Sequence, residues 1–241
     1  MKRIAVFSDI HGNLQALKCI LKDIEKEKID NEDVYYLGDI IGFGPCPKEC
    51  LDLLIKSKFK AVKGNHEIYQ VDNRIKNALL SDNEKSHRDW VRSQLNKEEL
   101  EYIKNLPMSI EELIYGQLFT FSHFFLNKKS NYFESLTILN DNTAYDVANA
   151  IETDYMFIGH CHDDFQIHSE RLVTCGGSSG CTVDQSTFYL IVEIEGYNIK
   201  IIRKELNYDR KAFERDLLKK DYPERNTLAE NFFGIKITEE E

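Results

Sequence analysis

The chain has 241 residues, with 31 Lys and Arg against 41 Asp and Glu, so its formal net charge is −10. Hydrophobic residues make up 42% and charged residues 30%, which indicates a globular protein with a buried core and excludes a disordered or fibrous chain. No apolar run approaches the roughly 18 residues of a membrane-spanning helix, so we expect no membrane partner. The acidic balance also argues against long nucleic acids as partners, because phosphate backbones are bound mainly by clustered positive charge.

The first apolar run is short and six cysteines are spread along the chain. Ser8 and Asp9 end that run too early for the apolar core of a signal peptide, so we expect a cytoplasmic protein with reduced thiols. Cys46 and Cys50, four residues apart, could supply two ligands to a zinc ion. No second pair of matching spacing is evident, which favours ordinary buried thiols for both.

Short apolar runs alternate with amphipathic stretches in the N-terminal part of the chain. Residues 3–7 form an apolar run that predicts a buried strand. From Leu14 the apolar residues recur at helical spacing, and Asn13 is a suitable N-cap for that helix. The next expected elements are strands at 34–37 and 59–62 and a helix at 48–56. This βαβαβ order predicts a largely parallel sheet flanked by helices, with functional groups at the carboxyl ends of its strands.

A polar helical insertion is expected at residues 68–106. Asn96 and Glu99 have the spacing of a capping box, and Pro107 ends the second helix. Later expected elements are strands at 118–121, 155–158, 165–168, 172–174, 188–194 and 199–204, a hairpin turn at 195–198, and helices at 143–151 and 210–219. We find no repeat and no low-complexity linker, so we predict a single domain over residues 1–241 with a C-terminal helix and acidic tail at 206–241.

Five of the seven histidines lie in short polar motifs that follow predicted strands. The motifs are Asp9-Ile10-His11, Gly38-Asp39, Gly64-Asn65-His66-Glu67, Ser122-His123 and Gly159-His160-Cys161-His162. Parallel strands bring their carboxyl ends to one edge of a sheet, so we expect these side chains to converge. A four-residue Gly-Asn-His-Glu occurs by chance in roughly one chain in a thousand, so the joint pattern indicates a metal site.

These motifs resemble those of the calcineurin-like metallophosphoesterases, and most closely the small prokaryotic phosphodiesterase-like members. The resemblance covers the chain to about residue 162, and a glycine loop at 175–180 extends it to about residue 203. It implies an α/β fold, a four-layer αββα sandwich of two mixed sheets with flanking helices. The sequence departs from the family pattern in having Glu67 where Asp is usual, in lacking a second acidic residue after Gly38-Asp39, and in lacking a glycine beside His123.

The resemblance implies a site for two divalent transition-metal ions. By motif, Asp9, His11 and His162 would hold the first ion and Asn65, His123 and His160 the second, with Asp39 bridging them. Nitrogen and oxygen ligands of this kind suit Mn, Fe, Ni, Co or Zn. His66 would contact the phosphoryl group or protonate the leaving group rather than bind metal. Asn13, Phe43 and Tyr69 are further candidates for contact with substrate, Asn13 because helix N-termini attract anions.

We therefore expect a phosphoesterase that hydrolyses a small phosphodiester or phosphomonoester with a metal-bridging hydroxide. Alternatives on the same site are a nucleotide pyrophosphohydrolase and a protein phosphatase, and an alternative of another class is a non-catalytic metal-binding scaffold. Two divalent ions, Asp9, Asp39 and a hydroxide leave a local charge of about +1, so the net charge of −10 does not exclude an anionic substrate. His123, taken alone beside two phenylalanines, could instead be a core residue.

Overall fold

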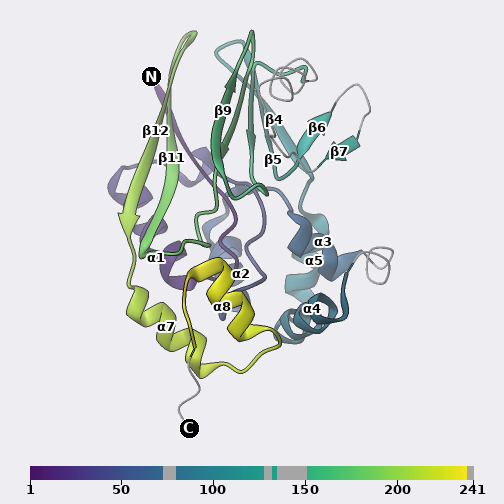
Figure 1. Cartoon of the computed structure of the whole chain (residues 1–241). Helices are drawn as coiled ribbons and strands as arrows, with labels where there is room; N and C mark the ends of the chain where they lie inside the picture. The colour runs from purple at the N-terminus through teal and green to yellow at the C-terminus, as the bar shows by residue number, and fades with distance from the viewer. Residues whose placement is uncertain (73–79, 128–131, 135–150, 238–241) are drawn as a thin grey trace.

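The computed structural model describes residues 1–72, 80–127, 132–134 and 151–237. Two five-stranded mixed sheets pack together in the upper part of the molecule, and several helices gather below them (Figure 1). The N-terminus lies near the top and the C-terminus at the bottom. Among the described residues, no helix has both the length and the apolar character needed to cross a bilayer.

The first sheet has the strand order β12-β11-β1-β2-β3. Its strands are β1 (Lys2–Phe7), β2 (Val34–Tyr36), β3 (Lys60–Ala61), β11 (Ser186–Glu195) and β12 (Asn198–Asn207). β1, β2 and β3 are parallel, as the βαβαβ pattern predicts, whereas β11 pairs antiparallel with β1 and β12 pairs antiparallel with β11. The β11–β12 hairpin pairs Glu195 with Asn198, so its turn lies at the expected residues.

The second sheet has the strand order β4-β5-β8-β10-β9. Its strands are β4 (Ser109–Ile114), β5 (Gln117–Ser122), β8 (Tyr155–Ile158), β9 (Asp164–His168) and β10 (Leu172–Gly176), and a separate hairpin joins β6 (Phe125–Asn127) to β7 (Tyr132–Glu134). β5, β8 and β10 are parallel, and β4 and β9 are antiparallel edge strands. The carboxyl ends of β5 and β8 therefore lie at the same edge of the sheet.

The core between the sheets follows from the two-residue period of the strands. Along β1, Ile4 and Val6 face the second sheet, whereas Ala5 and Phe7 face the helices. Tyr35 of β2 stacks on Phe121 of β5 with ring centroids 3.7 Å apart, which joins the two sheets directly. Both faces of the first sheet are buried, so β1 from Ile4 onward and all of β2 are apolar, as expected for parallel strands covered on both sides.

Helices cover the outer face of the first sheet and surround the end where its parallel strands stop. They are α1 (Leu14–Lys26), α2 (Pro47–Ser57), α3 (Asn65–Val71), α4 (Asp82–Gln94), α5 (Lys97–Asn105), α7 (Arg210–Lys219) and α8 (Arg225–Phe233), with a short 3₁₀ turn at Asn31–Asp33. The expected capping box is present in α5, where Asn96 Oδ1 accepts from the Glu99 amide at 2.9 Å and Glu99 accepts from the Asn96 amide at 2.7 Å.

The structure adds elements that the sequence patterns did not reveal. The sequence patterns did not predict β4, because it is an edge strand in which Glu111 and Glu112 interrupt the apolar pattern. α8 has almost no periodic apolar face, since Phe232 and Phe233 lie side by side in its sequence. The helix α3 begins at Asn65, inside the motif rather than after it. The helix expected at 143–151, which would form the outer layer on the second sheet, lies outside the described residues.

Candidate metal centre

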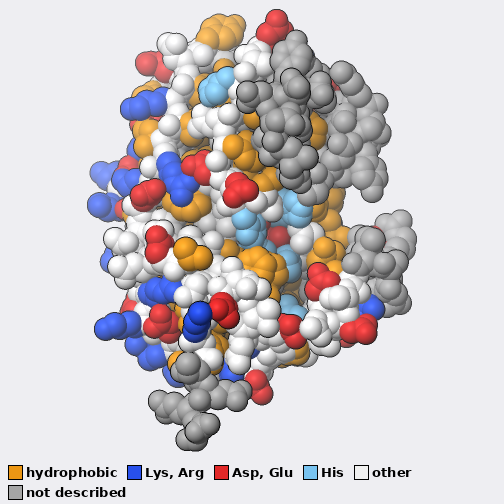
Figure 2. Space-filling view, viewed as in Figure 1, with side chains coloured by type: hydrophobic (Ala, Val, Ile, Leu, Met, Phe, Trp, Pro, Cys, Tyr) orange, Lys and Arg blue, Asp and Glu red, His pale blue; other side chains and the backbone are white. Residues whose placement is uncertain are grey.

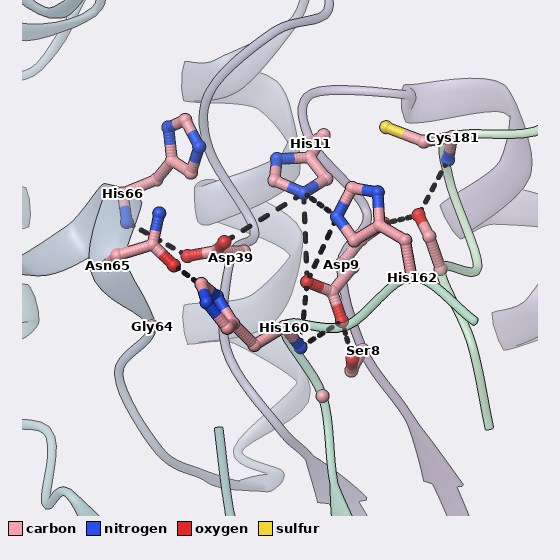
Figure 3. Close-up of polar contacts among 12 residues, drawn as sticks. Ser8, Asp9, His11, Asp39, Gly64, Asn65, His66, His160, His162 and Cys181 are labelled. Carbon is pink, nitrogen blue, oxygen red and sulfur yellow. Dashed lines mark hydrogen bonds and ion pairs between the residues drawn. The ribbon is translucent and has the colours of Figure 1, made fainter. Parts of the chain in front are cut away.

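The predicted site residues converge at the carboxyl ends of the parallel strands. Asp9 and His11 follow β1, Asp39 follows β2, and Asn65 begins α3 just after β3. His123 follows β5, and His160 and His162 follow β8. Figure 3 shows the side chains from these separate strands meeting at one point, and Figure 2 shows histidine side chains grouped near the middle of this face of the molecule.

The first group of ligand atoms is formed by Asp9, His11 and His162. The Nε2 atoms of the two histidines lie 3.0 Å apart, and they lie 3.7 and 3.5 Å from Asp9 Oδ1. Ligand atoms held about 2.1 Å from one ion at tetrahedral or octahedral angles lie about 3.0–3.4 Å apart. The geometry of this group therefore fits a divalent ion.

The second group is formed by Asn65, His123 and His160. Asn65 Oδ1 lies 2.9 Å from His160 Nδ1 and 3.0 Å from His123 Nε2. His123 Nδ1 lies 2.7 Å from the Leu37 carbonyl oxygen and donates to it, so Nε2 is the atom turned toward the group. Amide oxygen and imidazole nitrogen are ordinary ligands of first-row transition metals, so this group also fits a divalent ion.

Asp39 lies between the two groups. Its Oδ2 atom is 3.8 Å from His11 Nε2 and 3.3 Å from His123 Nε2. Its Oδ1 atom accepts a hydrogen bond from the His66 amide at 2.9 Å, which fixes the orientation of the carboxylate. Of the described carboxylates, Asp39 therefore has the position that a bridging ligand requires.

Burial and charge act in opposite directions on the ionisable groups of the site. Asp9 and Asp39 are buried, which raises the pKa of a carboxyl group, but the nearby imidazoles of His11 and His162 hold the pKa of Asp9 well below its usual range. The charges of His123 and His66 do the same for the pKa of Asp39. Burial lowers the pKa of His123, but Asp39 outweighs it and raises that pKa to about 10. In the metal-free chain a proton on His123 thus balances Asp39, and ion binding would release it.

The backbone at the site is held in an unusual conformation. Asp9, His11, Asp39, His160 and His162 all have positive φ, between 49° and 69°. Non-glycine residues rarely adopt this left-handed region, and such positions concentrate at functional sites because the surrounding structure maintains them. The loops after β1 and β2 restrain one another through backbone hydrogen bonds, from the Asp9 amide to Gly38 O at 3.0 Å and from the His11 amide to Asp39 O at 2.9 Å.

The glycine loop at residues 175–180 makes hydrogen bonds to the backbone of the Asp9-Ile10-His11 motif. The Gly180 amide donates to Asp9 O at 3.0 Å, and Ser178 Oγ donates to the same oxygen at 2.8 Å. A Cβ atom on Gly180 would lie 2.0 Å from Ile10 O, so only glycine allows this approach. The loop therefore takes part in holding Asp9 and His11 in place.

Glu67 makes contacts beside the site that the sequence patterns did not show. It is completely buried, and its carboxylate accepts hydrogen bonds from the backbone amides of Asp39 at 2.7 Å, Gly64 at 2.8 Å, Ile40 at 3.0 Å and Ile41 at 3.3 Å. Burial and the charge of Asp39 raise the pKa of Glu67, while these amides favour its ionised form. The side chain thus joins the Asp39 loop to the Asn65 loop. The only indication in the sequence was its place at the third residue of α3, where Glu commonly caps a helix.

His66 lies at the edge of the ligand set. Its ring packs edge-on against His11, with centroids 4.9 Å apart, and against Phe43 at 4.6 Å. A ring nitrogen lies within 4.8 Å of ligand atoms of His11 and Asp39. In Figure 3 the imidazole is set apart from Asp9 and no marked interaction begins at its ring. Burial lowers the pKa of His66.

Asn13 is buried beside the site, and both ends of its side-chain amide make a hydrogen bond. Its Oδ1 atom accepts from the Ala16 amide at 3.0 Å, which confirms the predicted N-cap of α1, and its Nδ2 donates to Gly180 O at 2.9 Å. One N–H of its Nδ2 atom is left over after the bond to Gly180 O, so contact with a phosphate stays a prediction.

The cysteines divide into packing residues and one neighbour of the site. Cys46 and Cys50 are buried on α2, and neither belongs to a potential metal-binding group of the described residues. The thiol of Cys161 hydrogen-bonds that of Cys175 and so faces away from the ligands. Cys181, which the motifs did not include, lies within 4.8 Å of ligand nitrogens of His11 and His162.

Sequence comparison agrees with the fold and the grouped ligands: residues 2–164 match the family of calcineurin-like phosphoesterases. The chain belongs to this family, whose members are usually metal-dependent phosphoric ester hydrolases. It is 32% identical over 250 residues to the uncharacterized protein MJ0912 of Methanocaldococcus jannaschii, with 95% of this chain and 97% of that protein covered.

Two solved structures resemble the chain over nearly its whole length. The metallophosphoesterase from Sphaerobacter thermophilus matches with a TM-score of 0.70 and 25% identity, covering 94% of this chain and 98% of that one. The hypothetical protein PH1004 from Pyrococcus horikoshii matches with a TM-score of 0.77 and 22% identity, covering 98% and 100%. Together with the two mixed sheets, these matches confirm the predicted metallophosphoesterase sandwich.

Proposed function

We propose that this protein is a two-metal phosphoesterase that hydrolyses small phosphodiesters or phosphomonoesters. The observation that carries the proposal is the position of Asp39, whose Oδ2 atom lies within 4 Å of a histidine from each ligand group. A carboxylate shared in this way suits two adjacent ions, the arrangement used by many enzymes that cleave phosphoric esters. Two bound ions would supply Lewis acidity and a water molecule of lowered pKa.

The chain's own residues orient the ligands and restrict their protonation. His123 Nδ1 donates to Leu37 O, which keeps Nε2 directed at Asn65 and Asp39. Glu67 accepts hydrogen bonds from the backbone amides of Asp39 and Ile40. These bonds would hold the Asp39 side chain in a fixed position relative to the other proposed ligands. Asp9, Asp39 and Glu67 supply negative charge in a buried site, which favours divalent cations over the metal-free state.

His66 is the group we assign to proton transfer. Its ring lies beside the ligands, and Phe43 packs against it at 4.6 Å. A partly exposed imidazole at this position can hydrogen-bond a phosphoryl oxygen or protonate the departing oxygen of the ester. Its lowered pKa leaves the ring neutral near pH 7, so its one N–H can donate a hydrogen bond to a phosphoryl oxygen. Protonation of the departing oxygen would require the imidazolium form, which the negative charge of a bound phosphate would favour.

The test is to remove metal with a chelator, reload the protein separately with Mn, Fe, Co, Ni or Zn, and assay p-nitrophenyl phosphate and bis-p-nitrophenyl phosphate. We expect about two metal equivalents per chain and turnover with at least one ion. Asp39→Asn should remove at least one equivalent and lower turnover by more than about 100-fold, because loss of a residue that merely supports a metal ligand commonly costs about 10- to 100-fold and Asp39 would be a direct ligand.

Several outcomes would contradict the proposal. A protein that binds two ions yet hydrolyses neither ester would instead be the metal-binding scaffold. Activity confined to nucleoside polyphosphates would indicate a pyrophosphohydrolase, and activity confined to phosphorylated protein would indicate a protein phosphatase. A chain that retains no metal would remove the basis of the two-ion site.

A further inference from the structure

Helix α8 brings a phenylalanine from near the end of the chain to the metal centre. The family match covers residues 2–164, so α7 and α8 lie outside it. Figure 1 shows α8 in yellow below the two sheets. Its Phe232 stacks on Phe43, with ring centroids 4.0 Å apart and an angle of 20° between the rings. The matched motifs therefore do not include this contact.

Phe43 connects α8 to two histidines of the site. Its ring also stacks on His11, with centroids 4.4 Å apart and an angle of 23°. Two rings that lie nearly parallel to Phe43 at such distances occupy its opposite faces, so Phe232, Phe43 and His11 form one stack. The His66 ring stands nearly perpendicular to this stack, 4.6 Å from Phe43 and 4.9 Å from His11.

The loop that carries Phe43 lies directly against both histidines. A Cβ atom on Gly42 would be 2.5 Å from His66 Nδ1, so the loop backbone touches the imidazole. The Gly44 amide donates to His11 O at 2.8 Å. Phe43 itself has a φ of 23°, which is unusual for a residue with a side chain. A displacement of this loop would therefore be transmitted to both imidazoles.

The C-terminal segment holds Phe43 through its backbone as well as its ring. Tyr222 Oη donates to Phe43 O at 3.0 Å. Arg210 of α7 donates to Phe233 O at 2.7 Å, which ties the end of α8 to α7. Phe233 is completely buried in the core between these helices, whereas Phe232 is only partly buried. Adjacent phenylalanines of α8 thus differ: Phe233 packs the helices together, and Phe232 contacts the loop at the site.

Ring packing restrains the orientation of His66. Besides the stack, the Tyr69 ring borders it at 5.7 Å. Among the residues drawn in Figure 3, none makes a marked interaction with the His66 ring. A group that takes part in phosphoester cleavage has to be held precisely, because a displacement of about 1 Å can cost about 100-fold in rate. The neighbouring rings are therefore the means by which this structure orients the imidazole.

We propose that Phe43 and Phe232 are positioning residues that act through His66. Phe232 keeps Phe43 in its stack on His11. Phe43 in turn holds the His66 ring in the orientation that contact with a phosphoryl or departing oxygen requires. The inference rests on the proposed phosphoesterase activity and adds to it two residues outside the ligand set. Both faces of Phe43 are covered, so the structure favours this role over the contact with substrate that the sequence suggested for Phe43.

The test compares Phe232→Leu, Phe232→Tyr and Phe233→Leu in the metal-loaded protein. Leu at position 232 keeps apolar volume but removes the ring, so kcat for phenyl esters of phosphate should fall about 10- to 100-fold with two metal equivalents retained. Tyr keeps the ring and should restore most of the activity. Phe233→Leu is the matched control, since loss of this buried side chain should lower stability and leave kcat unchanged.

A double-mutant cycle shows whether the effect passes through His66. In a His66→Asn background, Phe232→Leu should cause little further loss of kcat, because residues that act as a unit are not additive. The histidine ring signals in NMR spectra of the metal-free protein give a second readout that needs no turnover. Phe232→Leu should shift the His66 signal, identified by its absence in His66→Asn, whereas Phe233→Leu should leave it in place.

Three results would overturn the inference: an equal loss of kcat in Phe232→Leu and Phe233→Leu, a full additional loss in the His66→Asn background, or loss of a metal equivalent in Phe232→Leu. The last would assign the effect to His11 as a ligand. If wild type hydrolyses no ester, the proposed function fails, and an unshifted His66 signal in Phe232→Leu would then overturn the positioning role as well. If Phe232→Leu does not fold, Phe43→Leu takes its place in the same cycle.

Discussion

The Glu67 carboxylate accepts a hydrogen bond from the Asp39 backbone amide at 2.7 Å, and this contact joins two loops that carry predicted metal ligands. Asn65 lies two residues before Glu67 and begins the same helix. The orientation of Asp39 and that of Asn65 are therefore set together by one buried side chain. The Glu67 side chain is long enough to reach the amides of both loops.

Glu67→Gln should weaken metal binding and turnover by about 10- to 100-fold, because an amide replaces one acceptor oxygen with a donor that faces backbone N–H groups. Metal content at graded free-ion concentrations and kcat measure the effect. Glu99→Gln is the matched control, since Glu99 is also a buried capping glutamate at the third residue of a helix but lies away from the site. It should lower stability and leave metal binding intact; equal losses of metal in both variants would show that Glu67 acts only on stability.

His66→Asn should lower kcat by about 100- to 10,000-fold while both metal equivalents remain bound, because the imidazole is assigned to proton transfer and not to ligation. Metal analysis and kinetics on the same sample check this. The loss should shrink for p-nitrophenyl esters relative to alkyl esters, since p-nitrophenolate departs without protonation. Loss of a metal equivalent in this variant would make His66 a ligand instead.

The stability of the metal-free protein should fall between pH 7 and pH 4 in part through His87. Burial lowers the pKa of His87 from 6.5 to about 4, so the unfolded chain binds more protons than the folded one between these values. Stability attributable to this residue is thus complete above pH 6.5 and is lost as pH falls toward 4, by up to about 3 kcal/mol. Urea midpoints at pH 7 and pH 4.5 should differ less in His87→Phe than in wild type. An identical pH dependence in the two proteins would contradict the assignment.

Gly180→Ala should reduce both stability and metal affinity, because its Cβ would lie 2.0 Å from the Ile10 carbonyl oxygen, between two predicted ligands. Backbone cannot yield as a flexible side chain does, so we expect a loss of about 3 kcal/mol or more. Gly116→Ala, where a Cβ meets no atom within 4 Å, should cost only about 1 kcal/mol for its positive φ and spare metal binding. Chemical unfolding and metal titration of both variants separate the two effects.

The sequence by itself determined the succession of the N-terminal strands along the chain and the polar residues that follow them. These properties are local: apolar runs followed by Asp9, Asp39 or Asn65 show both a strand and the residue that ends it. Local spacing also located the capping box of α5, because Asn96 and Glu99 are only three residues apart in the chain. The apolar pattern did not predict β4, because β4 is an edge strand that is only partly buried and therefore has an incomplete apolar pattern.

Only the tertiary structure decided which side chains meet. His11 and His162 are 151 positions apart, yet their Nε2 atoms lie 3.0 Å from one another because β1 and β8 belong to sheets that pack face to face. The same holds for Glu67, whose partners become visible only when two loops are placed side by side, and for Phe43, whose partner Phe232 comes from α8 near the end of the chain. The sequence specifies the chemistry of each side chain. The distance between two side chains from different elements depends on how the buried surfaces of those elements pack, and no local sequence pattern encodes that distance.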